Sequence, residues 1–219
     1  MDLTVLYKIS YGMYIIGVCE NDRPTGCIIN TFTQITSENP IVSVCLNKNN
    51  YTYEVLKRTK RFSLSILSEE TKRNAISIFG FANGKEMNKF SHVQYEMKDG
   101  LPLVQENCCG WLTCDVLDMA DEETHMIVIA RLTDTQHGGN FKPMTYDYYY
   151  NVVKGKASKN APTYQASAAA PVSAPVQEKQ RYMCDICSYV YEGDFASLPE
   201  DYVCPICGAS KAHFKPVEK

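Results

Sequence analysis

The chain has 219 residues, of which 45% are hydrophobic and 21% charged, with a formal net charge of −3 at pH 7. This composition is ordinary for a folded protein and excludes wholesale disorder, and without a basic excess no nucleic-acid partner is expected. The longest apolar stretch near the start, 13–19, is far below the roughly 20 residues that cross a bilayer, so no membrane partner is expected either.

Strand-like runs rich in β-branched and apolar residues alternate with two helical stretches over the first 155 residues. Strands are expected at 13–20, 26–30, 41–46, 62–67, 111–117 and 126–132. Helices are expected at 51–60, with Asn50 as a possible N-cap, and at 69–79, with Gly80 as the stop. Many strands with few helices predict a mainly β fold, a β-barrel decorated by helices.

Composition changes sharply near residue 156. Residues 156–179 are rich in Ala, Ser and Pro and leave little to bury, which predicts a flexible linker. A poly-Ala helix is the alternative, and the spaced Pro162, Pro171 and Pro175 disfavour it. The linker divides the chain into two predicted domains, 1–155 and 180–219.

Ten cysteines are the outlier in the composition, and four of them lie in the C-terminal segment. The others are scattered, and acidic Asp2 does not suit a secretory signal peptide, so we expect reduced thiols in the cytoplasm. The four form two C-x-x-C pairs, Cys184 with Cys187 and Cys204 with Cys207, with 16 residues between the pairs. Each tight turn aims two thiolates at a common point, so the pairs predict a tetrahedral metal site.

The metal is not decided by spacing, which also fits a zinc ribbon. The segments 189–194, 198–209 and 211–214 closely resemble rubredoxin, and the resemblance covers 181–216. It implies one iron, cycling between ferric and ferrous, held by Cys184, Cys187, Cys204 and Cys207. Structural zinc remains the alternative. The acidic surroundings favour an acceptor protein with a basic docking patch, and a merely solvated acidic surface is the alternative.

Familiar nucleotide and hydrolase fingerprints are missing: the sequence has no G-x-G-x-x-G, P-loop, G-x-S-x-G or H-E-x-x-H. Two polar runs stand out instead, at 30–37 and 45–52. Hydroxyls, amides and a lysine at the N-terminus of a predicted helix make a reasonable phosphate site. An ordinary polar loop with Asn50 as N-cap is the alternative.

These runs, with 7–16, 79–81, 124–125 and 145–146, together resemble the flavin reductase family, which has an FMN-binding split barrel. The similarity extends over about residues 1–164. It implies FMN as cofactor, NADH or NADPH as electron donor, and a homodimer with flavin near the interface. The fusion of the two domains resembles the high-molecular-weight rubredoxins of anaerobes.

The family resemblance also implies roles for individual residues. The isoalloxazine ring and ribityl chain would be lined by Asn30, Thr31, Gln34, Thr36 and Ser37. The ribityl and phosphate would be held by Asn47, Lys48, Asn50 and Thr52. The site would be closed, in one arrangement from the other subunit, by Phe79, Gly80, Phe81 and Lys89.

Two residues are implied as catalytic. Cys45 would sit near the flavin ring, and His125 would help place the nicotinamide, a role that Thr31 could share. The alternatives are a small buried hydrophobe for Cys45 and an ordinary structural histidine for His125. Glu123 occupies the hairpin position before Thr124 where relatives often have glycine.

The two resemblances together predict an electron-transfer oxidoreductase. Electrons would pass from NAD(P)H through FMN to the four-cysteine iron, because hydride carries two electrons and one iron accepts one. The family suggests a flavodiiron oxygen or nitric oxide reductase as acceptor protein. Such an acceptor would give this chain a role in oxidative stress. The alternatives are a flavin reductase that supplies reduced FMN to a monooxygenase, and a non-catalytic zinc-ribbon redox sensor.

Overall fold

The computed structural model describes residues 1–153, 181–185, 189–192, 195–196, 198–204 and 208–216. The chain divides into two compact units, 1–164 and 165–219, and each is described by itself. The linker predicted at 156–179 lies outside the described residues, so the domain boundaries stay predictions.

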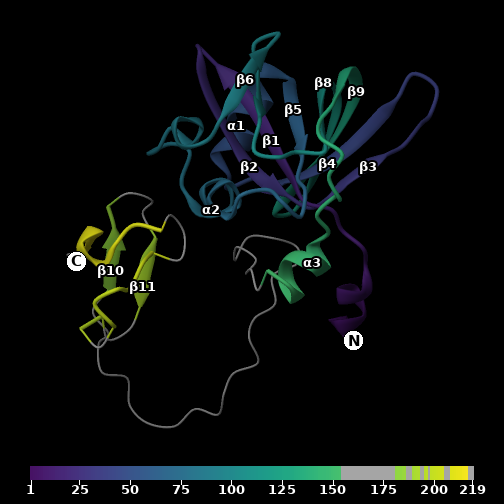
Figure 1. The fold of residues 1–219 in the computed structure, drawn as a ribbon. Helices are drawn as coiled ribbons and strands as arrows, with labels where there is room; N and C mark the ends of the chain where they lie inside the picture. Colours follow the sequence, from purple (N-terminus) through teal and green to yellow (C-terminus); the bar gives the residue numbers. More distant parts are fainter. Residues whose placement is uncertain (154–180, 186–188, 193–194, 197, 205–207, 217–219) are drawn as a thin grey trace. The chain divides into compact units, whose positions relative to one another are not determined.

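Seven strands of the first unit form one antiparallel sheet in the order β2-β1-β5-β8-β9-β4-β3. The strands are β1 (Tyr14–Glu20), β2 (Arg23–Ile29), β3 (Phe32–Gln34), β4 (Ile41–Asn47), β5 (Arg61–Ile66), β8 (Gly110–Glu122) and β9 (His125–His137). Figure 1 shows this sheet curled around its own interior. A separate hairpin consists of β6 (Tyr95–Lys98) and β7 (Leu101–Val104).

Helices are short and few in the first unit. They are the 3-10 helices η1 (Leu3–Lys8) and η2 (Lys89–His92) and the α-helices α1 (Tyr51–Thr59), α2 (Arg73–Phe81) and α3 (Tyr146–Asn151). Helix α1 begins at Asn50, whose side chain accepts a hydrogen bond from the Thr52 amide, and ends at Lys60 in a left-handed conformation. None of the helices in the described part of the chain is long and apolar enough to cross a membrane.

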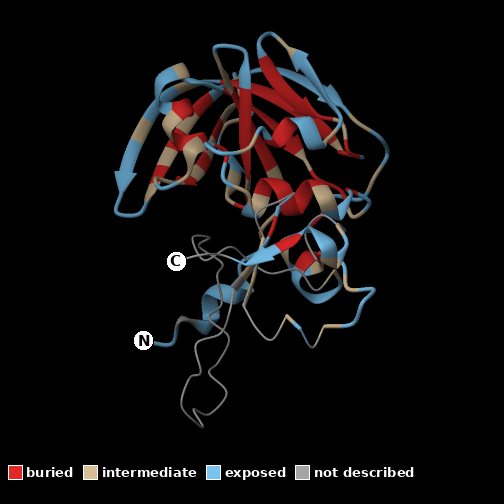
Figure 2. Cartoon of the chain, turned by 90° about the vertical axis from the view of Figure 1, so that its left-hand side faces the viewer, coloured by how far each residue is buried: buried red, intermediate tan, exposed pale blue. Residues whose placement is uncertain are grey.

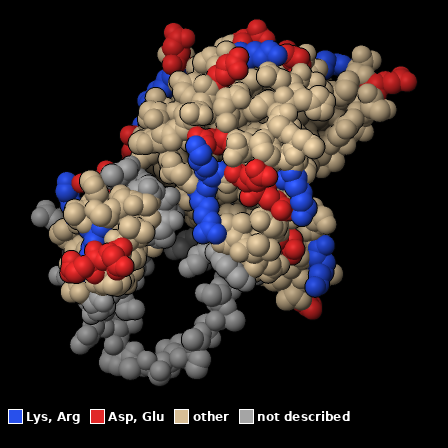
Figure 3. All heavy atoms as spheres, in the orientation of Figure 1, with Lys and Arg blue, Asp and Glu red and all other residues tan. Residues whose placement is uncertain are grey.

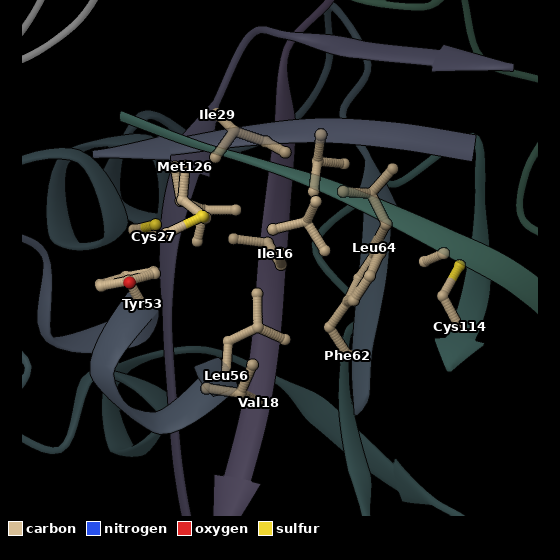
Figure 4. Close-up of a cluster of buried hydrophobic side chains, with 14 of the residues drawn as sticks. Ile16, Val18, Cys27, Ile29, Tyr53, Leu56, Phe62, Leu64, Cys114 and Met126 are labelled. Atoms are coloured by element: carbon tan, nitrogen blue, oxygen red, sulfur yellow. The ribbon is translucent and has the colours of Figure 1, made fainter. Parts of the chain in front are cut away.

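Alternating side chains of the strands fill the interior of the curled sheet. On β4 the burial pattern alternates strictly, with Val42, Val44 and Leu46 buried. Figure 4 shows how Ile16, Leu56 and the other labelled side chains converge from the strands and from α1. Figure 2 shows the buried residues concentrated along the strands and on one side of the helices.

The mainly β fold predicted from the sequence is confirmed, and each of the six predicted strands is present. Strands β8 and β9 extend well past the predicted 117 and 132, and β3, β6 and β7 were not predicted. The second predicted helix was wrong at its start. The side chains of Ser68 and Thr71 hold the chain at 68–71 in a turn, so α2 begins only at Arg73 and Gly80 lies inside it.

The described residues of the second unit form a three-stranded sheet, ordered β11-β10-β12, and one short helix. Its elements are β10 (Arg181–Cys184), β11 (Val190–Glu192), η3 (Lys211–His213) and β12 (Phe214–Pro216). Aromatic rings form its core: Tyr182 stacks on Phe195 with ring centroids 4.3 Å apart, and Phe214 contacts Phe195 and Tyr202.

Candidate functional site

The outer face of the sheet, opposite the barrel core, collects the accessible polar side chains of β3, β4 and β9. Directly paired residues of antiparallel strands point to the same face, so the register arranges them in rows. From one end of β4 to the other, the rows are Ile41 with Arg131, Ser43 with Ile129, Cys45 with Ile127, and Asn47 with His125. All except the exposed Arg131 are half-buried, so these rows form a partly accessible platform.

Thr31, directly before β3, joins the third of these rows. Its carbonyl accepts a hydrogen bond from the Cys45 amide at 3.3 Å, and its hydroxyl donates to the Cys45 carbonyl at 3.4 Å. Asn30, buried to 8% exposure, precedes it at the end of β2. The structure therefore brings Asn30, Thr31 and Cys45 together.

The turn from β4 into α1 is built from asparagines. The Asn47 side chain accepts a hydrogen bond from the Asn49 amide at 2.9 Å, and the Asn50 side chain accepts one from the Thr52 amide at 3.1 Å. Helix α1 points its N-terminus at this turn, and such an end favours an anion. The Thr52 hydroxyl oxygen is buried and has no hydrogen-bond partner among the described residues.

Lys48 ties this turn to the tip of the β8–β9 hairpin. Its amide donates to the Thr124 carbonyl at 3.0 Å, and its ammonium pairs with the Asp121 carboxylate at 2.6 Å. The Lys48 side chain is 28% exposed, so the pair is within reach of solvent. A phosphate that approaches Lys48 would therefore share it with Asp121.

His125 stands at the start of β9, opposite Asn47. Its Nδ1 lies 2.9 Å from the Thr124 hydroxyl, which fixes the imidazole ring against the hairpin tip. Glu123 adopts φ 48°, the left-handed region that favours glycine, so the chain makes the hairpin turn with a non-glycine residue. The structure thus groups Asn47, Lys48, Asn50 and His125 at one end of the platform.

The platform has the chemistry that a flavin mononucleotide needs. Cys45 and Ile127 supply an apolar floor for a flat ring, and Thr31 and Asn47 supply polar atoms at its sides. The first turn of α1 can receive a phosphate. These residues fit the group that the family resemblance implies.

Gln34, Thr36 and Ser37 lie apart from this end. The Gln34 amide donates to the Thr36 carbonyl at 3.0 Å, and the Thr36 hydroxyl accepts from the Ile41 amide at 2.9 Å, so these residues shape the loop before β4. Ile41 and Asn47 are the two ends of β4, about 20 Å apart at 3.3 Å per residue. The role of this loop in flavin binding stays a prediction.

Phe79 and Lys89 are buried rather than placed at the platform surface. The Lys89 ammonium donates to the Gly26 carbonyl at 2.9 Å and the Phe79 carbonyl at 3.4 Å. Burial lowers the pKa of Lys89 to about 8, and a negative charge on nearby Cys27 opposes that shift. Gly80 packs near Ile28, and only Phe81 of this predicted group is exposed. Their role in closing the site stays a prediction.

Sequence reasoning missed Ile41, Ser43, Ile127, Ile129 and Arg131 of the platform rows, and Asp121 beside the end of the platform. The missed signal is the alternation after His125, in which Met126, Val128 and Ala130 face the core and the residues between them face outward. Asp121 could not be found, because its pairing with Lys48 depends on how far the β8–β9 hairpin extends.

The second unit buries two of the four predicted metal ligands, Cys184 at 0% and Cys204 at 2% exposure. Around them the backbone forms tight turns: the Cys184 amide donates to the Tyr189 carbonyl at 2.8 Å, and the Gly208 amide donates to the Cys204 carbonyl at 2.9 Å. Gly208 has φ 72°, which glycine adopts without strain. Cys187 and Cys207 lie outside the described residues, and the described ones alone contain no cluster of three ligands.

The aromatic core encloses these cysteines. Tyr189 and Tyr202 both contact Phe214, which lies opposite Cys184 on β12. Burial raises the pKa of Tyr202 to about 12, and the neighbouring Tyr189 adds to the shift. Two buried thiols in an apolar aromatic shell, each next to a tight turn, fit a thiolate-bound metal.

Comparisons with known proteins agree with this division. Residues 6–153 match the model of the flavin reductase-like domain, and residues 182–215 match that of the rubrerythrin, rubredoxin-like domain. The chain is 37% identical to the high molecular weight rubredoxin of Moorella thermoacetica, across 99% of this chain and 100% of that protein. It is 36% identical to the NAD(P)H ferric-chelate reductase of Archaeoglobus fulgidus, across 75% of this chain and 98% of that protein.

Solved structures with lower identity share the fold. Nitrilotriacetate monooxygenase component B of Mycobacterium thermoresistibile matches with a TM-score of 0.58 at 23% identity, covering 64% of this chain and 78% of that one. The FMN-binding protein of Thermus thermophilus matches with a TM-score of 0.55 at 17% identity, covering 60% and 72%. The predicted fold class, a flavin reductase-like barrel followed by a rubredoxin-like domain, is confirmed.

Proposed function

The chain belongs to the flavin reductase-like family and carries a rubredoxin-like domain near its C-terminus, and we propose that it passes electrons from NAD(P)H through FMN to a four-cysteine iron site. The observation that carries this proposal is the presence of both domains in one chain. A relative that aligns with 99% of this chain over 100% of its own length is named a high molecular weight rubredoxin.

The two domains supply complementary chemistry. A nicotinamide gives up a hydride, which carries two electrons, whereas one iron held by four thiolates accepts a single electron. A bound flavin supplies the conversion, since it accepts two electrons and releases them singly. Each NAD(P)H oxidised therefore reduces two ferric centres in turn and releases one proton to water. Neither domain needs a protein nucleophile for this reaction.

In the first unit the chain's own residues bind and orient the flavin. The floor of Cys45 and Ile127 holds the ring, Asn30 and Thr31 fix its polar edge, and the start of α1 receives the phosphate. His125, fixed by Thr124, lies at the end of the platform where the nicotinamide would approach. Lys48 shares its charge between Asp121 and the phosphate.

In the second unit, Cys184, Cys187, Cys204 and Cys207 bind the iron as thiolates. The aromatic shell keeps water from the buried ligands Cys184 and Cys204, and this burial tunes the reduction potential. In this proposal the predicted linker, 156–179, acts as a tether, so the rubredoxin-like domain can meet the flavin and then the acceptor at high effective concentration.

The proposed acceptor is a flavodiiron oxygen or nitric oxide reductase, and the proposed setting is the cytoplasm, with the chain acting as a homodimer. A second candidate is a flavin reductase that supplies a separate monooxygenase, because a relative from Rhodococcus opacus is the reductase component of a nitrophenol monooxygenase. The rubredoxin-like domain favours the first proposal, since a reductase that releases its flavin has no need of an iron centre.

Anaerobic titration of the full-length protein with NADH and then NADPH tests the proposal. Visible spectra are recorded with the metal and flavin content. About one FMN and one iron per chain, both bleached by NAD(P)H, are expected. Flavin that bleaches while the iron stays ferric would overturn the internal transfer. Zinc without flavin, in protein made with ample iron, would favour the redox-sensor alternative.

A further inference from the structure

The first ten residues form an apolar arm with no covering of its own. We call residues 1–10 the N-terminal arm. Its helix, η1, is held by its own Asp2 cap, and every described side chain from Thr4 to Ser10 is exposed. Its large apolar side chains are Val5 at 64%, Leu6 at 50%, Tyr7 at 53% and Ile9 at 49% exposure. A short helix whose described side chains are all exposed has little to stabilise it.

The arm belongs to the barrel domain rather than to a tail. The match to the flavin reductase-like domain begins at residue 6, inside η1. Beyond the arm the chain is well fixed, since the Tyr11 carbonyl accepts from the Tyr146 amide at 2.8 Å and Gly12 pairs with Thr145. The arm is therefore held at its base and uncovered along its helix.

A second unpartnered apolar surface lies on the outer sheet face, at the end of the platform away from Asn47. It consists of Ile35, which is 52% exposed, with half-buried Ile41 and Ile129. The Ile35 amide donates to the Ile41 carbonyl at 2.7 Å, and Ile129 lies in the next row, opposite Ser43. We call these three residues the isoleucine patch.

The two apolar surfaces cannot cover each other within one copy. In Figure 1 the arm lies near the N label, whereas the β3–β4 hairpin, which carries the patch, projects away from it at the other end of the barrel. When two copies exchange arms about a two-fold axis, the arm and the patch of each copy are both covered by the other copy.

Charge favours the same partner. Lys8 on the arm has no ion-pair partner among the described residues, and neither has Glu38 in the loop beside Ile35. Figure 3 shows an acidic group at the free end of the β3–β4 hairpin. A cation on the arm and an anion beside the patch are complementary between two copies.

We propose that the N-terminal arm of each copy packs on the isoleucine patch of a second copy, in a reciprocal exchange that makes the homodimer. This assignment rests on the proposed homodimer and names its surfaces. The patch adjoins the row of Cys45 and Ile127, so the partner's arm would border the flavin platform.

Sedimentation velocity of the full-length chain over a range of concentrations tests this exchange. The arm variant Val5→Ser/Leu6→Ser and the patch variant Ile35→Ser are each expected to raise the dimer dissociation constant by at least roughly tenfold, because each loss occurs twice in a two-fold dimer. Met97→Ser, which alters a side chain 43% exposed on the β6–β7 hairpin, is the matched control and should leave the constant unchanged.

The combined arm and patch variant should raise the dimer dissociation constant no more than the stronger of the two single variants does, because the two surfaces touch each other. Full additivity, or an equal effect of Met97→Ser, would overturn the assignment while leaving a dimer in place. A chain that is monomeric throughout would overturn the dimer as well. Flavin titration of the same samples is a separate readout, so a failure of flavin binding is recognised independently.

Hydrogen exchange of the arm provides a second measurement. Amides 3–10 should exchange fast at low concentration and slowly at concentrations where the dimer forms. Protection that does not depend on concentration would show that the arm is covered within its own copy, by the rubredoxin-like domain for example, and would contradict the exchange.

Discussion

Cys45 on β4 and Ile127 on β9 stand directly opposite each other on the outer face of the barrel, with the Thr31 carbonyl hydrogen-bonded to the Cys45 amide. This pairing places a thiol and a branched aliphatic side chain side by side in the middle of the platform. The rows on either side are unlike: Asn47 and His125 are both polar, whereas Ser43 is paired with Ile129, a residue of the isoleucine patch. One sheet face therefore carries the flavin site at one end and an apolar contact at the other.

Ile127→Asp is expected to weaken FMN binding by at least roughly tenfold, because a carboxylate replaces the apolar floor beneath the ring. The measurement is the quenching of flavin fluorescence on titration with the full-length protein. Ile127→Val is the matched control, since it keeps the floor and the β-branch, and it should stay within about threefold of the wild type. Equal affinities of the two variants, both folded by circular dichroism, would show that the ring does not rest on β9.

Asn50→Ala is expected to destabilise the first unit by roughly 1 kcal/mol, because it removes the side chain that caps α1. For a unit of this size, that loss lowers Tm by about 2–4 °C. Calorimetry of the apoprotein measures it without flavin. Asn49→Ala is the control, because Asn49 is exposed and its side chain bonds to no described residue. Equal Tm values for Asn50→Ala and Asn49→Ala would show that the Asn50 cap does not stabilise the first unit.

The sequence predicted the strands that alternate cleanly, such as β4, and the N-cap of α1. Asn30 and Thr31, which join β2 to β3, lie beside Cys45 of β4 through the hydrogen bonds of Thr31, and their roles in flavin binding stay predictions. Helix α2 was misplaced because Glu69 and Glu70 suit a helix start, whereas hydrogen bonds from Ser68 and Thr71 fix a turn there.

Other features depend on pairing between distant strands. Asp121 reaches Lys48 only because the β8–β9 hairpin continues through polar residues, which carry no apolar alternation to reveal a strand. Lys89 was predicted, with Phe79, Gly80 and Phe81, to close the flavin site. Its burial follows from tertiary packing, since the Gly26 carbonyl of β2 and the Phe79 carbonyl of α2 accept hydrogen bonds from its ammonium.

Lys89 should make stability depend on alkaline pH. Its pKa is lowered from 10.5 to about 8 by burial. Below pH 8 the amine is charged in the folded and the unfolded chain, and the cost of burying the charge is fully present. Between about 8 and 10.5 the unfolded chain binds the extra proton, so the free energy of unfolding rises with pH, by up to about 3 kcal/mol.

Urea unfolding between pH 7 and 10 measures this dependence. Buried thiols oppose it, because burial raises the pKa of Cys108 and of Cys114 to about 12, so wild type is compared with Lys89→Met at each pH. The unfolding free energy of the wild type minus that of Lys89→Met should increase as the pH rises. Lys57→Met, on the exposed face of α1, is the control. A difference that stays flat with pH would mean that the Lys89 amine is not desolvated.

Cys204→Ser is expected to remove the metal and unfold the rubredoxin-like domain while flavin binding is retained. Cys204 is 2% exposed in an aromatic core of few residues, and a unit so small depends on its metal for stability. Iron content and the thiolate-to-iron absorption should fall to background, and NAD(P)H should still bleach the flavin. Cys19→Ser, a half-buried thiol of β1, is the control and should keep both signals. Retention of full iron by Cys204→Ser would exclude Cys204 from the ligand set, whereas loss of flavin from that variant would mean that the two domains fold as one.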